Sequence, residues 1–318
     1  MKKKIFVLSL IASTFSLTFP IKAFAVDLYA AGSLTNALTE VKESFTKETG
    51  IPVTTTFNGS GTLAQQIQDE LAKTGKSADV FASADIGNAQ KLYDKGLSNP
   101  VVNFTSNRLV AVVRPGLSVT PENLLDFLLN PDINVGTSTP IKDPSGDYAF
   151  QVFDKADKIK PGSSQTLKEK ALQLVGGNPS APVLPTGKNS LVYFLKETQK
   201  ADIFLSYYTS GKAAQSLSDG NDLQLIELPD YLATKADYGL TVLKNADPDS
   251  EKLAAYILSP EGQAILARNG FSSPSRLTSV PEHQGVGGIV FAVGAAFVLQ
   301  KKLASAKKQQ VSVGGSSK

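Results

Sequence analysis

Cysteine and tryptophan are absent from the 318 residues, and methionine and histidine occur once each, as Met1 and His283. Without cysteine the chain can form no disulfide, no thiolate nucleophile and no cysteine-ligated zinc or iron–sulfur site. With one histidine, Ser-His-Asp catalysis and imidazole metal sites are excluded unless His283 takes part. Many common enzyme classes are therefore excluded.

An excess of positive charge is also missing from the body of the chain. The formal net charge of +3 comes from the ends, because residues 1–25 carry four lysines and no acid, and residues 276–318 carry six basic residues and one acid. Residues 26–275 hold 22 basic and 28 acidic residues. Lys and Arg contacts to phosphates supply most nucleic-acid affinity, so we expect no nucleic-acid partner.

The first 25 residues have the pattern of an export signal. Three lysines follow Met1, an apolar stretch runs over 5–19, and Ala23-Phe24-Ala25 is a small-x-small cleavage sequence. An uncleaved membrane anchor is the alternative. We predict a signal peptide over 1–25 and a mature protein in the periplasm or another extracytoplasmic location, where ATP and NAD are essentially unavailable.

The C-terminal tail, 276–318, contains a second apolar segment at 285–300, followed directly by Lys301 and Lys302. Sixteen helical residues span about 24 Å, which is less than the roughly 30 Å of a bilayer core. The lysines have the position of a stop-transfer charge. The segment is therefore compatible with a membrane tether or with a loosely ordered tail.

The body alternates between apolar runs typical of strands and amphipathic periodicity typical of helices. Predicted strands fall at 27–31, 53–57, 79–83, 107–113, 134–136, 203–207, 223–228 and 237–243. Predicted helices fall at 34–49, 63–71, 88–95, 122–129, 146–156, 165–175, 190–200, 211–218 and 250–269. This alternation predicts an α/β fold with mostly parallel sheets flanked by helices, and such sheets bind ligands at the carboxyl ends of their strands.

Four strand-to-helix junctions carry glycine next to hydroxyl or amide residues. Their sequences are Ala31-Gly32-Ser33, Asn58-Gly59-Ser60-Gly61-Thr62, Pro144-Ser145-Gly146 and Thr186-Gly187-Lys188-Asn189-Ser190. A helix N-terminus offers unpaired N–H groups and about half a positive charge, which suits a small anion. Each junction alone is equally typical of an ordinary helix cap, so four of them together only favour an anion site.

Five segments resemble the periplasmic molybdate-binding proteins of ABC importers, a type II periplasmic solute-binding family. They are AAGSLTNAL (30–38), FNGSGTLAQQI (57–67), ADVFASAD (78–85), DPSGDYAFQVF (143–153) and SPEGQAILARNGF (259–271). The resemblance implies two α/β lobes joined by a hinge of crossing strands near 108–113 and 237–243. It places lobe 1 at 26–108 and 241–275, and lobe 2 at 109–240.

The resemblance also implies a set of oxyanion ligands. Ser33 and Ser60 match the family's hydroxyl donors, Ser145 matches a backbone donor, Lys188 falls on another backbone donor, and Tyr208 matches the tyrosine donor. The third loop, 138–148, is longer than in the best-known members, and Lys188 places an ammonium where those members have an apolar residue. The anion class is therefore better supported than the element.

Physical chemistry separates the candidate anions in part. Molybdate and tungstate are fully deprotonated dianions at neutral pH, so a pocket of donors alone suits them. Phosphate retains a proton and favours an acceptor carboxylate, for which Asp143 and Asp147 are the nearby candidates. Sulfate has the charge of molybdate but is smaller, so separating the two depends on the size of the cavity, which the sequence does not show.

Two other functions fit parts of the sequence. Adjacent Tyr207 and Tyr208 resemble the paired phenolate ligands of ferric-ion-binding periplasmic proteins, and oxygen ligands suit a hard trivalent ion. Residues 59–64 fit the dinucleotide motif GxGxxA, with Asp85 about 20 residues further on. Export argues against the dinucleotide enzyme.

The prediction is an exported oxyanion-binding protein, with molybdate as the first candidate and tungstate as the second. We expect it to deliver its ligand to the permease and ATPase of an ABC importer. We expect a monomer with no enzyme activity and no cofactor, since no bond is made or broken.

Overall fold

The computed structural model describes residues 25–274. The predicted signal peptide therefore lies outside the described residues apart from Ala25, as do residues 275–318 with the apolar segment 285–300. Within 25–274, no helix is both long enough and apolar enough to cross a membrane.

Nine strands form one curled sheet with the order β2-β1-β3-β9-β4-β7-β5-β6, and β8 pairs with β4 beside this path. The strands are β1 (Val26–Ala31), β2 (Val53–Asn58), β3 (Val80–Ser83), β4 (Val102–Val113), β5 (Val135–Ser138), β6 (Leu172–Val175), β7 (Ile203–Tyr207), β8 (Gln224–Glu227) and β9 (Lys235–Val242).

Helices cover this sheet. They are α1 (Thr35–Thr49), α2 (Ser60–Thr74), α3 (Ile86–Asp94), α4 (Leu124–Leu129), α5 (Pro144–Asp157), α6 (Ser163–Lys170), α7 (Ser190–Val192), α8 (Tyr208–Gln215), α9 (Ser250–Leu258) and α10 (Pro260–Arg268), with a short 3₁₀ helix, η1 (Gly32–Leu34), and a short π-helix, η2 (Tyr193–Glu197). In α1 the buried residues Ala37, Leu38, Val41 and Phe45 recur at helical spacing. The helix ends at Gly50, whose φ of 74° is the left-handed conformation that glycine adopts readily.

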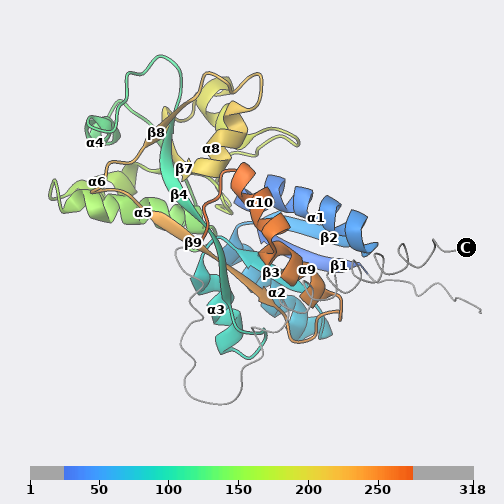
Figure 1. The fold of residues 1–318 in the computed structure, drawn as a ribbon. Coiled ribbons are helices and arrows are strands. Elements are labelled where there is room, and N and C mark those ends of the chain that lie inside the picture. Colours follow the sequence, from blue (N-terminus) through green and yellow to red (C-terminus); the bar gives the residue numbers. More distant parts are fainter. Residues whose placement is uncertain (1–24, 275–318) are drawn as a thin grey trace, which may run out of the picture.

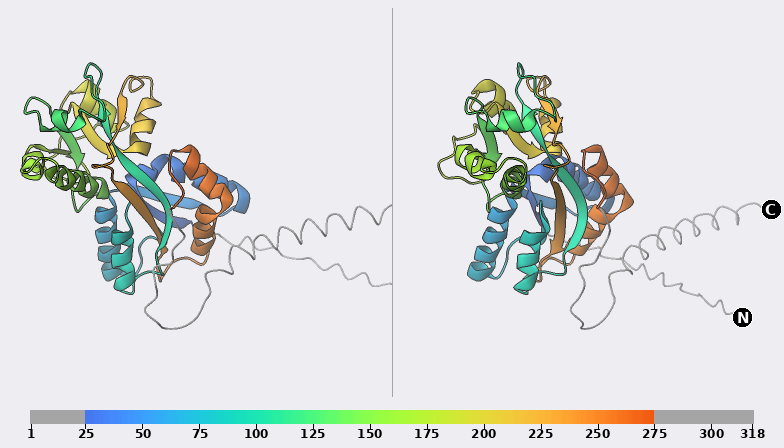
Figure 2. Two further views of the ribbon diagram at one scale, coloured as in Figure 1. Left: turned by 60° about the vertical axis from the view of Figure 1, so that its left-hand side comes forward. Right: turned by 90° about the vertical axis from the view of Figure 1, so that its left-hand side faces the viewer.

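The long strand β4 joins two halves of the sheet. Its residues 102–108 pair with β9, and its residues 109–113 pair with β7. Figure 1 shows α1, α2, α3, α9 and α10 around one half and α4, α5, α6 and α8 around the other, with β4 and β9 running between them, and Figure 2 shows the same arrangement from two further sides. Every paired residue of β9, from Lys235 on, lies against β3 or residues 102–108 of β4, so the pairing changes halves at 108/109 and again before Lys235. The lobe boundaries expected from the resemblance, 108/109 and 240/241, stay a prediction.

The sheet is mixed, and its parallel and antiparallel strand pairs lie in different parts of it. Strand β1 runs parallel to β2 and β3, and β5 runs parallel to β6 and β7. Every antiparallel pair involves β4 or β9. The expected parallel sheets are therefore present in both halves away from the crossing strands, and the α/β fold is confirmed.

Two predicted helices were wrong in detail. Residues 165–175 are not one helix, because α6 ends at Lys170 and Leu172–Val175 form the edge strand β6 on β5. The helix expected over 250–269 is two helices, since Pro260 has no N–H to continue α9 and instead begins α10, with Ser259 as its cap.

Candidate functional site

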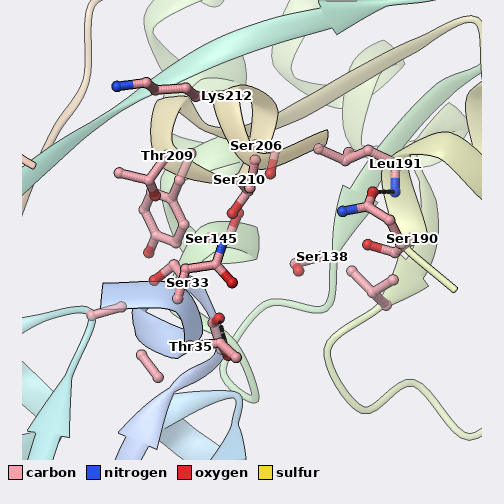
Figure 3. A pocket seen from close by; sticks show the side chains of 18 of the residues that line it. Ser33, Thr35, Ser138, Ser145, Ser190, Leu191, Ser206, Thr209, Ser210 and Lys212 are labelled. Carbon is pink, nitrogen blue, oxygen red and sulfur yellow. Dashed lines mark hydrogen bonds between the residues drawn. The ribbon is translucent and has the colours of Figure 1, made fainter. Parts of the chain in front are cut away.

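A cavity of about 570 Å³ lies where the carboxyl ends of strands from both halves meet. Hydroxyl side chains from several elements line it: Ser33, Thr35, Ser138, Ser145, Ser190, Ser206, Thr209 and Ser210. Figure 3 shows these hydroxyls on elements from the two sides of the cavity, with Ser33 and Ser145 close to each other. Because hydroxyls donate hydrogen bonds without carrying charge, such a wall suits an anion.

The topology explains why these residues meet. Ser33 follows β1, Ser138 ends β5, Ser145 lies in the first turn of α5, and Ser206 and Thr209 flank the junction of β7 with α8. Parallel strands present their carboxyl ends at one edge, and the loops that follow them share that edge. The sequence places these loops far apart in the chain, and the sheet brings them together.

Ser33 is held by a buried polar chain that reaches into the other half. Its Oγ lies 2.8 Å from Oη of the buried Tyr238 on β9. The amide of Asn107 on β4 donates to the same Oη at 3.2 Å and to Oγ1 of Thr209 at 2.8 Å. Two cavity hydroxyls, Ser33 and Thr209, are therefore linked through the crossing strands.

The third predicted loop reaches the cavity with Ser145, as expected, and it also brings a carboxylate. Asp143 lines the cavity and caps α5, because its Oδ1 accepts from the N–H of Ser145 at 3.0 Å. Its Oδ2 accepts from the hydroxyl of Ser138 at 2.7 Å. The N–H that the resemblance assigns to an oxyanion is therefore bonded to Asp143 in this structure. Burial raises the pKa of Asp143, and the nearby Asp147 and Asp85 carboxylates raise it further.

The two adjacent tyrosines have different surroundings. Tyr207 lines the cavity, and its hydroxyl is buried with no hydrogen-bond partner among the described residues. Tyr208, the predicted donor, does not line the cavity, because its ring packs 3.8 Å from the guanidinium carbon of Arg108. The tyrosine that lines the cavity is therefore Tyr207, one residue before the position that the resemblance implies.

The same placement weakens the ferric site expected from Tyr207 and Tyr208, since only one of them faces the cavity. Burial raises the pKa of Tyr207 well above its usual range, which opposes the phenolate form that iron requires. In the part of the chain that the structure describes, no group of three or more His, Cys, Asp or Glu residues could hold a metal ion.

Ser60 lies beneath the cavity wall and not on it. The residue is fully buried, and its Oγ accepts from the N–H of Ala84, a cavity residue, at 2.9 Å. The start of α2 is covered by the 139–143 loop, because the N–H of Thr62 donates to the carbonyl of Lys142 at 3.1 Å. This carbonyl occupies the helix start at which the dinucleotide motif would bind a pyrophosphate.

Glycine is required for that contact. A Cβ on Gly59 would lie 2.5 Å from the Lys142 carbonyl oxygen, and one on Gly61 would lie 2.0 Å from that of Ile141. Ile141 itself has a φ of 70°, a left-handed conformation that is costly for a β-branched residue. The glycines of the GSG motif therefore permit close packing of α2 against this loop.

Lys188 lines the cavity, but its polar groups have other partners. Its Nζ forms an ion pair with Glu197 at 2.8 Å, and its N–H donates to the carbonyl of Pro185 at 3.1 Å. The predicted backbone donor and the ammonium are therefore both bonded within lobe 2.

Several cavity residues were not predicted from the sequence, among them Ser138, Thr209, Lys212 and Arg268. Arg268 lies within a segment that carries the resemblance, and Thr209 directly follows the tyrosine pair. The signal that could have identified Ser138 is its hydroxyl at the carboxyl end of the buried strand β5.

Comparisons with known proteins give the family and relatives. A family model described as bacterial extracellular solute-binding protein matches residues 26–272. An uncharacterised protein of Pasteurella multocida is 32% identical over 214 residues, covering 67% of this chain and 85% of the relative. The molybdate-binding protein ModA of Escherichia coli is 26% identical over 259 residues, covering 78% of this chain and 88% of the relative.

Solved structures share the fold. The periplasmic molybdate-binding protein of Azotobacter vinelandii superposes with a TM-score of 0.61 at 18% identity, covering 78% of this chain and 99% of that one. The sulfate-binding protein SubI of Mycobacterium tuberculosis gives a TM-score of 0.58 at 18% identity, covering 86% and 90%. A ferric-binding protein of Campylobacter jejuni superposes with a TM-score of 0.58 at 17% identity, covering 78% of this chain and 86% of that one. Proteins with different ligands thus share this architecture.

Proposed function

The chain belongs to the bacterial extracellular solute-binding protein family, and from this premise we propose that it captures a tetrahedral oxyanion, with molybdate first and tungstate second. The observation that carries the proposal is the buried, unpartnered hydroxyl of Tyr207 on a wall rich in serine and threonine hydroxyls. A buried donor without a partner is costly, so a ligand oxygen is its natural acceptor.

The donor set supports an anion that is held by hydrogen bonds alone. The hydroxyls of Ser33, Ser145 and Tyr207 come from separate elements, and a hydrogen bond from a hydroxyl to an ionised oxygen is stronger than one to a neutral oxygen. Excluding water strengthens them further, because the local dielectric falls. The E. coli molybdate-binding relative supports molybdate within this class.

The biological role follows from the family. A solute-binding protein of this kind presents its ligand to the permease of an ABC importer, whose ATPase subunit supplies the energy. We place the mature chain outside the cytoplasm as a monomer. It performs no reaction, since binding and release change no bond of the oxyanion.

Calorimetry of the purified protein tests the proposal. Molybdate, tungstate, sulfate, phosphate and ferric citrate are titrated separately under one buffer condition. We expect saturable binding of at least one oxyanion and none of ferric ion. A visible tyrosinate–iron colour with ferric citrate, together with no heat from any oxyanion, would replace the oxyanion proposal with the ferric one.

A further inference from the structure

A carboxylate on the wall of an anion site needs an explanation. Asp143 shares the cavity wall with Ser33 and Tyr207 and is bonded to Ser138 and Ser145. Both serines are buried, at 3% and 4% exposure. An ionised carboxylate on this wall repels a dianion bound beside it, because a nearby like charge disfavours the ionised form of each group.

The carboxylate is also fixed in place. A Cβ on Gly176 would lie 2.8 Å from Cβ of Asp143, and a Cβ on Gly59 would lie 3.2 Å from it. Asp143 is therefore packed against a backbone segment from each side, and it caps α5 through Ser145. It cannot leave the wall without uncapping the helix.

No cation neutralises this group. Within residues 25–274, Asp143 forms no ion pair, and its charged neighbours Asp147 and Asp85 are both acidic. Of the cavity cations, Lys188 is paired with Glu197 and Arg268 with Glu40, and Lys212 donates to the carbonyl of Arg268. Figure 3 shows the Lys212 amine pointing away from the hydroxyls. The nearby phenols of Tyr207, Tyr238 and Tyr148 are neutral, because burial raises the pKa of each.

We propose that Asp143 and the bound oxyanion share one proton, so that the site holds its anion together with a proton. This inference rests on the proposed oxyanion function and adds the protonation state that the site selects. The proton has two sources. Hydrogen phosphate brings its own and donates it to the Asp143 carboxylate, whereas fully ionised molybdate binds only when Asp143 takes up one proton from solvent.

The sign of the pH dependence follows from this. The raised pKa of Asp143 means that the proton is lost as the pH rises through that value. Molybdate affinity should therefore be highest at acidic pH. Above the pKa of Asp143 it should fall by up to about tenfold for each pH unit. In Asp143→Asn the amide keeps the cap on α5 and carries no charge, so the fall should disappear.

The experiment titrates the full-length wild type, Asp143→Asn and Asp147→Asn with molybdate and with phosphate by calorimetry, in two buffers of different ionisation enthalpy, between about pH 5 and about pH 8. Asp147 is the matched control, because its carboxylate lies outside the cavity and accepts from the N–H of Ile141. Asp147→Asn keeps the Asp143 carboxyl and removes only one of the charges that raise its pKa, so its affinity profile should keep the wild-type slope and move toward lower pH. We expect one proton taken up with molybdate by the wild type and Asp147→Asn, and none by Asp143→Asn. In Asp143→Asn, molybdate should bind more tightly near neutral pH and phosphate more weakly.

The outcomes separate the two proposals. Oxyanion binding that is independent of pH and buffer, with the same profile in wild type and Asp143→Asn, would overturn the shared proton and leave the oxyanion function standing. Absence of any oxyanion binding in all three proteins would overturn the proposed function itself, and the shared proton with it.

Discussion

At the scale of single residues, the tyrosine pair shows how one position changes a site. Side chains of neighbouring residues on a strand point to opposite faces, and β7 ends at Tyr207. Tyr207 lines the cavity, and its buried hydroxyl has no partner among the described residues, whereas the ring of Tyr208, the first residue of α8, packs against the Arg108 guanidinium. A difference of one position along the chain therefore separates a residue that lines the cavity from one that packs against Arg108.

Replacing Tyr207 by Phe removes the unpaired hydroxyl and tests its role. We expect oxyanion affinity to fall by about 10- to 100-fold, since a hydrogen bond to a charged group contributes about 1.5–3 kcal/mol. The free energy of unfolding should stay equal or rise, because the hydroxyl has no hydrogen-bond partner among the described residues. Calorimetry and thermal unfolding measure the two quantities.

The matched control is Tyr208→Phe, which should leave the affinity unchanged because that residue does not line the cavity. A loss of affinity in Tyr208→Phe with none in Tyr207→Phe would restore the position predicted from the sequence.

Site residues could be predicted from the sequence where they lie at the start of a helix that follows a strand. Ser33 and Ser145 lie in such turns and reach the cavity as expected. Ser60 lies at a helix start too. Whether such a start opens to the cavity or is covered by a loop depends on the other half of the protein. The backbone of Lys142 covers it, and no local pattern in 57–67 indicates this.

At the scale of elements, the start of α2 depends on two glycines that face the 139–143 loop. Gly61→Ala should lower the free energy of unfolding by about 1–3 kcal/mol, because its Cβ would overlap the carbonyl of Ile141 and the backbone must shift. Chemical denaturation measures this change. Gly87→Ala in α3 is the control, since a Cβ there meets no atom closer than 4.0 Å and alanine favours the helix. Equal stability of the two variants would contradict the close contact.

Secondary structure was predictable wherever periodicity and a stop residue agreed. The strand 203–207 was predicted with the bounds that the structure has, and α1 ends at Gly50 as expected. The strand β6 was missed because its four residues, two of them only half-buried, show too short an apolar pattern, and its identity comes from pairing with β5.

At the scale of the whole molecule, one polar chain crosses between the halves. It runs from Ser33 through Tyr238 and Asn107 to Thr209, which belong to η1, β9, β4 and α8. Asn107 and Tyr238 are buried at 4% and 0% exposure, so each must keep its partners. We therefore expect the contributions of these four hydrogen-bonded side chains to the free energy of unfolding to depend on one another.

A double-mutant cycle tests this dependence. Asn107→Ala and Tyr238→Phe should each lower the free energy of unfolding by about 1–3 kcal/mol, because each leaves a buried polar group unsatisfied. The double variant should lose less than the sum, with a coupling of at least about 0.5 kcal/mol. Denaturant unfolding of the four proteins provides the values, and strict additivity would show that the two residues act independently.

The course of β4 and β9 has a consequence for how the chain acquires its structure. The half of the sheet made by 109–234 is an insertion between the two crossing strands, and β9 lies between β3 and β4 in the middle of the other half. During synthesis or export from the N-terminus, the inserted half has all its strands before the first half receives its central one. Until residue 242 arrives, β3 and β4 have open edges, and these edges are where premature aggregation or recognition by a chaperone would begin.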